Sequence, residues 1–265
     1  MAAIAAPTLV TRPPRVRPVA DALTIAWRNL LNIRRNPQLL VFATIQPVIF
    51  VLMFRYVFGG AISVPGVPYV DFLMPGIYIQ TVTFGALTTG VGLADDMNNG
   101  IIDRFRSLPM ARSAVLVGRT TADLTRNVFV VGLMAAVGFI VGFRIHTNWV
   151  AFLASLALVL LFAFALSWVF AFVGMTVGDG ETAQAASFPI LAPLVFASSA
   201  FVPVESMPGW LQAFAEHQPV SANVDACRAL VLGGPTAGEI LAAVAWSLGI
   251  IALFAPLAIR RYRKV

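Results

Sequence analysis

Residues Val150–Val177 read VAFLASLALVLLFAFALSWVFAFVGMTV, a run that contains no charged side chain. A helix needs roughly 20 apolar residues to cross the hydrocarbon core of a bilayer, since unpaired backbone groups in lipid are costly. The whole chain shares this character, because 59% of its 265 residues are hydrophobic and only 11% are charged, with a mean hydropathy of +0.85. We therefore predict an all-α, polytopic membrane protein.

Five other segments are also long and apolar enough to cross a bilayer. Six transmembrane helices are therefore expected, at about 39–58, 72–94, 127–143, 150–177, 182–201 and 240–259. The third segment is short, and we expect it to continue into the helix before it. Together these helices are predicted to form one membrane domain, residues 36–265.

Most of the 18 basic residues lie near the two ends of the chain and in the connection between the second and third expected spans. Loops rich in arginine and lysine stay on the cytoplasmic side of a membrane. We therefore predict a multi-pass protein of the cell (inner) membrane with both termini, and residues 95–126, in the cytoplasm. The connection at 178–181, GDGE, must then be cytoplasmic too, although it has no basic residue.

Two segments precede the first expected span. Residues 1–18 are rich in proline and arginine and lack the apolar core of a secretory signal, so we predict a disordered cytoplasmic tail. Residues 19–35 read VADALTIAWRNLLNIRR and are predicted to be an amphipathic helix on the inner membrane surface, with a cytosolic core helix as the alternative. The apolar face of this helix consists of Leu23, Trp27, Leu30 and Leu31.

The cytoplasmic connection contains a short amphipathic helical stretch between breaks at Gly100 and Pro109. Such a helix can dock into the groove of a partner protein, or it can lie on the membrane surface and only satisfy the charge rule. The residue pattern by itself favours neither reading. The apolar positions are Ile101, Ile102, Phe105 and Leu108, and the charged positions are Asp103, Arg104 and Arg106.

Residues 202–239, between the fifth and sixth expected spans, are too long for a turn and divide at Pro219. A first short helix is expected after Pro208, with Trp210 on it, and a second is expected from a cap at Ser221 to Leu232. The aromatic side chains of the first helix favour a helical hairpin that lies in or dips into the outer leaflet. The alternative is an exposed loop without a role of its own.

Several activities are not expected from the residue content. The only lysine is Lys264, so the chain has no phosphate-binding GxxxxGK[ST] loop, and any ATP must be hydrolysed by another chain. One cysteine and two histidines form no recognisable metal-ligand cluster, and the basic residues form no face for nucleic acid. We therefore predict no metal site, no catalytic residue and no nucleic-acid partner.

Two other kinds of membrane protein remain as alternatives at this stage. An ion-gradient-driven secondary carrier or channel usually has acidic residues or histidines at membrane depth, whereas Arg55 is the only ionisable residue clearly within an expected span. A membrane enzyme that acts on lipid needs a polar cluster at one interface, and none is recognisable. Neither alternative is favoured by the residues.

Two stretches resemble the type-2 ABC exporter permeases, and in particular their daunorubicin-resistance-like branch from actinobacteria. The first is NNGIIDRFRSLPMARSAVLVGR, Asn98–Arg119, and the second is FVPVESMPGWLQAFAEHQPVSANVDACRAL, Phe201–Leu230. The similarity extends over nearly the whole chain after the tail. Residues that match the family pattern are Gly100, Asp103, Arg104, Leu108, Pro109, Gly118 and Arg119 in the first stretch, and Pro203, Pro208, Trp210, Pro219 and Arg228 in the second.

This resemblance implies a permease subunit of an ATP-driven exporter for amphipathic drugs, polyketides or lipids. It implies separately encoded ABC ATPase subunits that hold ATP and magnesium, and a second permease copy or paralogue, with no cofactor bound to this chain. Gly100–Pro109 would then be the coupling segment that contacts the ATPase. The coupling residues implied are Gly100, Ile101, Ile102, Asp103, Arg104, Phe105, Arg106, Leu108 and Pro109.

Overall fold

A computed structural model of the chain describes residues 23–29, 31, 37–60, 62, 64, 66–106 and 112–264. Over these residues the elements are helical and no strand occurs, which confirms the predicted all-α class. The predicted tail, residues 1–18, lies outside the described residues. The elements are α2 (Pro37–Leu52), η1 (Met53–Phe58), α3 (Tyr69–Asn98), α4 (Ile101–Arg106), α5 (Arg112–Val141), α6 (Trp149–Val177), α7 (Gly180–Phe196), η2 (Val204–Ser206), α8 (Gly209–Glu216), α9 (Pro219–Leu232) and α10 (Thr236–Lys264).

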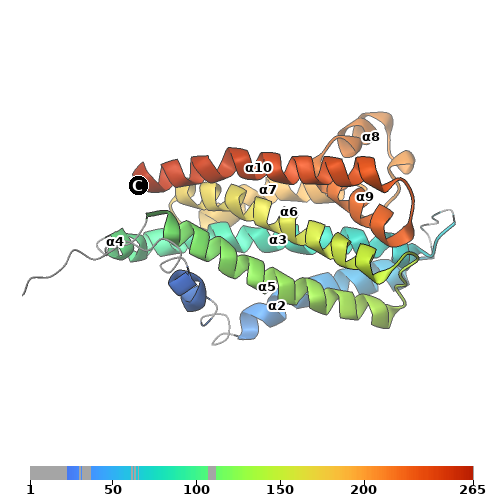
Figure 1. Cartoon of the computed structure of the whole chain (residues 1–265), viewed down its shortest axis with the longest axis horizontal. Helices are drawn as coiled ribbons and strands as arrows, with labels where there is room; N and C mark the ends of the chain where they lie inside the picture. Colours follow the sequence, from blue (N-terminus) through green and yellow to red (C-terminus); the bar gives the residue numbers. More distant parts are fainter. Residues whose placement is uncertain are drawn as a thin grey trace, which may run out of the picture.

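The long helices α3, α5, α6 and α10 run along the length of one bundle (Figure 1). Four segments of these helices are long and apolar enough to cross a bilayer. The short helix α4 and the end of α10 lie at one end of the bundle, and α8 and α9 lie at the other (Figure 1). The four segments are Tyr69–Asn98, Val115–Val141, Trp149–Val177 and Thr236–Arg263.

The remaining two expected spans are not among these four segments. The first corresponds to α2 continued by the π-helical η1, which together cover Pro37–Phe58 and include an apolar helix at Thr44–Phe58. The fifth corresponds to α7, which ends at Phe196 and not at the predicted residue 201. The helix contains Pro189 and Pro193, which weaken its hydrogen bonding. Beyond its end, Gln218 and Ser221 bind the backbone of the chain, which keeps it out of the helix. The count of six spans therefore stays a prediction.

The GDGE connection forms a short turn between α6 and α7. Gly178 adopts φ +90°, a conformation that favours glycine, and ends α6. Asp179 then caps α7, because its Oδ1 accepts a hydrogen bond of 2.8 Å from the backbone N–H of Thr182. This hydrogen bond to the ionised carboxylate lowers the pKa of Asp179.

The helix α5 begins well before the predicted third span. It runs without interruption from Arg112 to Val141, so the second half of the cytoplasmic connection is continuous with the span, as expected for so short a segment. Gly142, at φ +107°, ends it. The candidate span Val115–Val141 therefore contains ionisable side chains, which the sequence analysis had assigned to the connection.

The N-terminal amphipathic segment is helical at residues 23–29. Its side chains Leu23 and Trp27, on the predicted apolar face, are exposed, whereas Ile25 and Ala26 are buried. Leu23 and Trp27 of the predicted face thus point away from the bundle, and the face with Ile25 and Ala26 packs against the bundle. A location at the membrane surface remains a prediction for this helix.

The helices α3 and α6 cross in close contact. A Cβ atom placed on Gly174 would lie 2.2 Å from the carbonyl oxygen of Gly90, and one placed on Gly90 would lie 2.7 Å from that of Phe170. Both distances are shorter than van der Waals contact, and the obstructing atoms belong to the backbone. Only glycine fits at these two positions, and the two helices therefore pack backbone against backbone.

We expect Gly174→Ala to destabilise the bundle by about 1–3 kcal/mol, the usual effect of overpacking, because α3 and α6 must move apart. Thermal unfolding of the purified protein in one detergent measures this as a lower unfolding temperature. Gly132→Ala is the matched control, since a Cβ atom on Gly132 meets nothing within 4 Å. Equal unfolding temperatures for the two variants would contradict the close crossing.

Candidate functional site

The predicted coupling segment lies at the end of the bundle that also holds the end of α10 (Figure 1). Gly100 follows α3 at φ +68° and allows the chain to turn into α4. Ile102 of α4 is 3% exposed and packs in a cluster with Leu93 of α3, Leu116 of α5 and Tyr262 of α10. The short helix is therefore anchored to several long helices by one apolar side chain.

The structure places only part of the predicted coupling set. Gly100, Ile101, Ile102 and Arg104 come together in the turn and in α4, with Arg104 exposed and Ile101 half-buried. Asp103, Phe105 and Arg106 belong to α4 by their backbone, and their side chains lie outside the described part of the structure. Leu108 and Pro109 lie outside the described residues. The role of the set stays a prediction.

A row of polar contacts joins the halves of α3 and α5 that are nearest to α4, and we call it the α3–α5 ladder. At its first step, Nη1 of Arg119 lies 2.8 Å from Oδ2 of Asp96 and donates to the carbonyl oxygen of Gly92 at 3.1 Å. At its second step, the Thr89 hydroxyl donates to Oδ2 of Asp123 at 2.6 Å, and Asp123 is only 7% exposed. Each partner satisfies a charge or dipole that would otherwise be costly in an apolar bundle.

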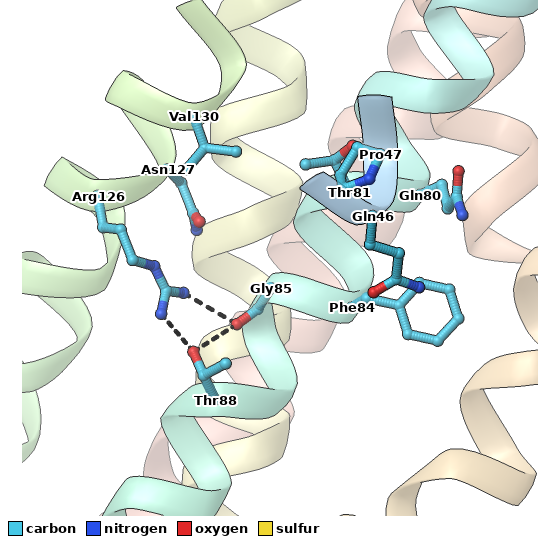
Figure 2. A pocket seen from close by; sticks show the side chains of 10 residues that line it. All are labelled: Gln46, Pro47, Gln80, Thr81, Phe84, Gly85, Thr88, Arg126, Asn127 and Val130. Carbon is cyan, nitrogen blue, oxygen red and sulfur yellow. Dashed lines mark hydrogen bonds between the residues drawn. The ribbon is translucent and has the colours of Figure 1, made fainter. Parts of the chain in front are cut away.

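The third step of the ladder belongs to Arg126. Its Nη2 donates to the carbonyl oxygen of Gly85 at 2.9 Å and its Nη1 donates to the Thr88 hydroxyl (Figure 2). Its Nη1 also lies 3.7 Å from Oδ1 of Asp123. The three steps recur once per helical turn on both helices, so they fix the register of α3 against α5.

This ladder is not predicted by the sequence. Arg119 and Arg126 are expected there as basic residues of a cytoplasmic connection, and Arg119 also as a match to the family pattern, whereas Asp96 and Asp123 have no expected partner. A pairing signal does exist in the sequence, because Arg119, Asp123 and Arg126 lie one helical turn apart and therefore share a face of α5. The sequence does not show that this face of α5 lies against α3.

At the opposite end of the bundle, α9 is mostly buried and is not an exposed loop. Its Arg228 donates to the carbonyl oxygen of Ser199 at 2.8 Å and lies 2.9 Å from Oδ1 of Asp225. The same guanidinium also donates to the carbonyl oxygen of Phe72 and lies 3.6 Å from the centre of the Phe72 ring. Arg228 thereby connects α9 to α3 and to the segment after α7.

The other predicted residues of the outer hairpin mark element boundaries. Pro203 precedes η2, Pro208 precedes α8, and Pro219 is the first residue of α9. Trp210 is on α8 and is exposed. The predicted helix start at Ser221 is wrong, because α9 begins at Pro219 and the Ser221 hydroxyl instead accepts a hydrogen bond from the backbone N–H of Ser199. The fixed φ of proline suits the first position of a helix.

A cavity of about 130 Å³ lies between α2, α3 and α5, next to the last step of the ladder (Figure 2). Two side-chain amide groups in its wall are buried, and Oε1 of Gln80 and Nδ2 of Asn127 have no hydrogen-bond partner. A buried polar atom without a partner costs about 1–3 kcal/mol. The lining residues are Gln46, Pro47, Gln80, Thr81, Phe84, Gly85, Thr88, Arg126, Asn127 and Val130.

The fold and these sites define a class of protein: a multi-pass membrane protein with a short helix at one end of its bundle and a buried helix at the other. Residues 21–232 match the ABC-2 type transporter family, and the chain belongs to that family. This confirms the resemblance found in the sequence. Members of the family are the membrane subunits of ABC transporters and work with separate ATPase subunits, so they are transporter components and not enzymes.

Individual relatives agree with this assignment. The chain is 34% identical to the daunorubicin resistance ABC transporter permease protein DrrB1 of Streptomyces coeruleorubidus, over 96% of this chain and 89% of the relative. It is 27% identical to the probable doxorubicin resistance ABC transporter permease protein DrrC of Mycobacterium tuberculosis, over 93% of this chain and 89% of the relative. A putative transport permease, ycf38 of Cyanophora paradoxa, is 22% identical over 80% of this chain and 74% of that protein.

We expect Arg228→Lys to lower the free energy of unfolding by about 1.5–3 kcal/mol, the contribution of one hydrogen bond to a charged group. An ammonium group cannot reach two carbonyl oxygens and a carboxylate in the fixed geometry of the guanidinium fork. Thermal unfolding in detergent tests this. The control is Arg260→Lys at an exposed position of α10. An unfolding temperature for Arg228→Lys equal to that of the control would show that the Arg228 contacts do not hold α9.

Proposed function

We propose that this chain is the membrane-spanning subunit of an ATP-driven exporter that moves amphipathic drugs, polyketides or lipids out of the cytoplasm or the inner leaflet by alternating access. Membership of the ABC-2 family supports the exporter part of this proposal. The names of two relatives, which refer to daunorubicin and doxorubicin resistance, support an amphipathic drug as cargo. ATP with magnesium would be held by separately encoded ATPase subunits.

The observation that carries the proposal is the attachment of α4 to the bundle. The helix follows α3 after a single turn at Gly100, and Ile102 seats it among α3, α5, α6 and α10. The α3–α5 ladder then joins the two helices that lie on either side of α4 in the chain. A force applied to α4 by an ATPase subunit would therefore move α3 and α5 together.

Alternating access also requires an outer end that can change. In the proposed cycle the buried helix α9 is the outer closure, because Arg228 connects it to the N-terminal turn of α3. Movement of α3 would strain these contacts at the outer end while the ladder keeps the inner end intact. A second copy of the permease, or a paralogue, would complete the translocation path.

An ion-gradient-driven carrier is the alternative function, and the contacts of the buried acids favour the exporter over it. Such a carrier needs a carboxylate that gains and loses a proton or an ion during transport. Asp123 is held by the Thr89 hydroxyl and lies near Arg126, and Asp71 lies 2.7 Å from Nε2 of His146 and accepts the backbone N–H of Arg144. Both carboxylates are committed to structural contacts.

The proposed orientation can be tested with single cysteines in a Cys227→Ser background, since Cys227 is the only cysteine of the chain. We expect a membrane-impermeant maleimide to label Trp210→Cys in intact cells, because α8 would face the exterior. Asn99→Cys, next to α4, should react only after the cells are permeabilised. Both positions are exposed in the structure. Labelling of Asn99→Cys in intact cells would place α4 on the wrong side for an ATPase and would overturn the proposal.

The proposed coupling role can be tested in the complex of this chain with its ATPase, reconstituted in lipid vesicles with daunorubicin as the probe. We expect Arg104→Ala to reduce drug-stimulated ATP hydrolysis by about fivefold or more, the lower range of ordinary coupling between sites. Insertion and yield should not change, because Arg104 is exposed. The control is Arg263→Ala, which removes an exposed arginine from the end of α10, at the same end of the bundle as α4. Equal activities of both variants would remove α4 from the coupling path.

A further inference from the structure

A second cavity, which we call the turn cavity, lies where α5 turns into α6, at the end of the bundle that holds α8 and α9 (Figure 1). Its volume is about 300 Å³. The candidate span on α5 ends at Val141 and the one on α6 begins at Trp149. The turn cavity is therefore at the level expected for lipid headgroups. Its lining residues are Phe139, Arg144, Ile145, Thr147, Asn148 and Trp149.

The turn that forms this cavity is attached to two neighbouring helices. The carboxylate of Asp71, on α3, accepts the backbone N–H of Arg144 at 2.8 Å and lies 2.7 Å from Nε2 of His146. The backbone N–H of His146 donates to the carbonyl oxygen of Val231, near the end of α9, at 3.0 Å. The wall of the turn cavity is thus a defined part of the fold.

The guanidinium of Arg144 lies in this wall with most of its donors unused. Its Nη1 donates to the carbonyl oxygens of Phe143 at 2.8 Å and Phe139 at 3.2 Å, and these bonds hold the group beside the end of α5. The N–H groups of Nη2 and Nε remain. Among the residues that the structure describes, no carboxylate forms an ion pair with Arg144, whereas Arg228, at the same end of the bundle, is paired with Asp225.

The surface beside the turn cavity is apolar and exposed. Ile140 of α5 is 84% exposed, and Leu153 of α6, one turn along from Trp149, is 62% exposed. Trp149 is itself 65% exposed, and the centres of its ring and of the Phe139 ring are 5.8 Å apart. Tryptophan is enriched where membrane helices meet the headgroup layer. A ligand that suits this place has an anionic group for Arg144 and apolar chains for the two helices.

We propose that the turn cavity binds the phosphate group of a phospholipid. The phosphodiester accepts two parallel hydrogen bonds from Nη2 and Nε of Arg144, the geometry in which a guanidinium binds phosphate. The amide nitrogen of Asn148 is a further donor, because the oxygen of the same amide already accepts the backbone N–H of Ala151. A lipid bound here is a ligand of the turn that connects α3 with α9, and its binding requires neither cargo nor ATP.

The size of the turn cavity decides which part of the lipid enters it. A cavity of about 150 Å³ in a protein core accommodates benzene. At about 300 Å³, the turn cavity accommodates a phosphate and the adjoining glycerol, but not two acyl chains. The chains therefore lie outside it, against the exposed side chains of Ile140 and Leu153.

Photo-crosslinking of the complex of permease and ATPase, in the phosphate-free detergent dodecyl maltoside, tests this site. The probes are a phosphatidylglycerol with a diazirine in one acyl chain and the diacylglycerol with the same chains. We expect phosphatidylglycerol to label peptides within residues 139–153 at least about tenfold more than diacylglycerol, the factor that one hydrogen bond to a charged group supplies. Mass spectrometry of the digested protein measures the labelling at each site.

Two substitutions separate binding from a structural role of Arg144. Arg144→Gln should remove the preference for phosphatidylglycerol, whereas Arg144→Lys should retain a clear part of it, because an ammonium group still attracts phosphate. Both substitutions remove the hydrogen bonds of the guanidinium to the α5 backbone, so a purely structural role predicts equal losses. The matched control is Arg260→Gln, at an exposed position of α10 near the opposite end of the bundle, which should leave labelling of 139–153 unchanged.

Three results would overturn the site. Equal labelling by the two probes in the wild-type complex would identify ordinary contact with lipid chains. Equal losses in Arg144→Gln and Arg144→Lys would assign Arg144 to the fold alone. Displacement of the phosphatidylglycerol label by an equal concentration of glycerol phosphate would show that a water-soluble phosphate, and not a lipid, is the ligand.

Discussion

The bundle depends on close backbone contact around α3. Apolar side chains gain little from packing on each other in a membrane, because lipid chains are equally apolar, so helices associate through close approach and polar contacts. The crossing at Gly90 and Gly174 supplies the first, and the α3–α5 ladder supplies the second. These contacts lie on different neighbours of α3, which makes this helix the element to which both α5 and α6 are fixed.

The two ends of α3 are held in different ways. At the end near α4, charged side chains of α5 reach the α3 backbone and its acidic residue Asp96, and the register of two long helices is fixed. At the other end, the Arg228 guanidinium and the Tyr69 hydroxyl connect α3 to the segment after α7, and Arg228 also connects it to the short helix α9. In the proposed cycle, the outer end is the one that opens, because the helix attached to α3 there is short and lies outside the ladder.

The long helices could be predicted because their signal is local. Runs of apolar residues mark α6 and α10 directly. Asn148 caps α6, because its side chain accepts a hydrogen bond from the backbone N–H of Ala151. The early end of α7 could not be predicted, since the groups that bind the chain after Phe196 come from Gln218 and Ser221, farther along the sequence. The ladder and the amide cavity were missed for the same reason. Their members are single polar residues on three different helices, and only the fold brings them together.

Arg126 belongs both to the ladder and to the wall of the cavity (Figure 2). Its guanidinium joins α5 to Gly85 and Thr88 of α3, so the wall of the cavity and the register between the two helices depend on one side chain. In the proposed exporter, a movement of α4 that shifts α3 against α5 would break these hydrogen bonds and change the shape of the cavity at the same time. A movement that carries the two helices together would leave both unchanged, because the guanidinium would keep its partners.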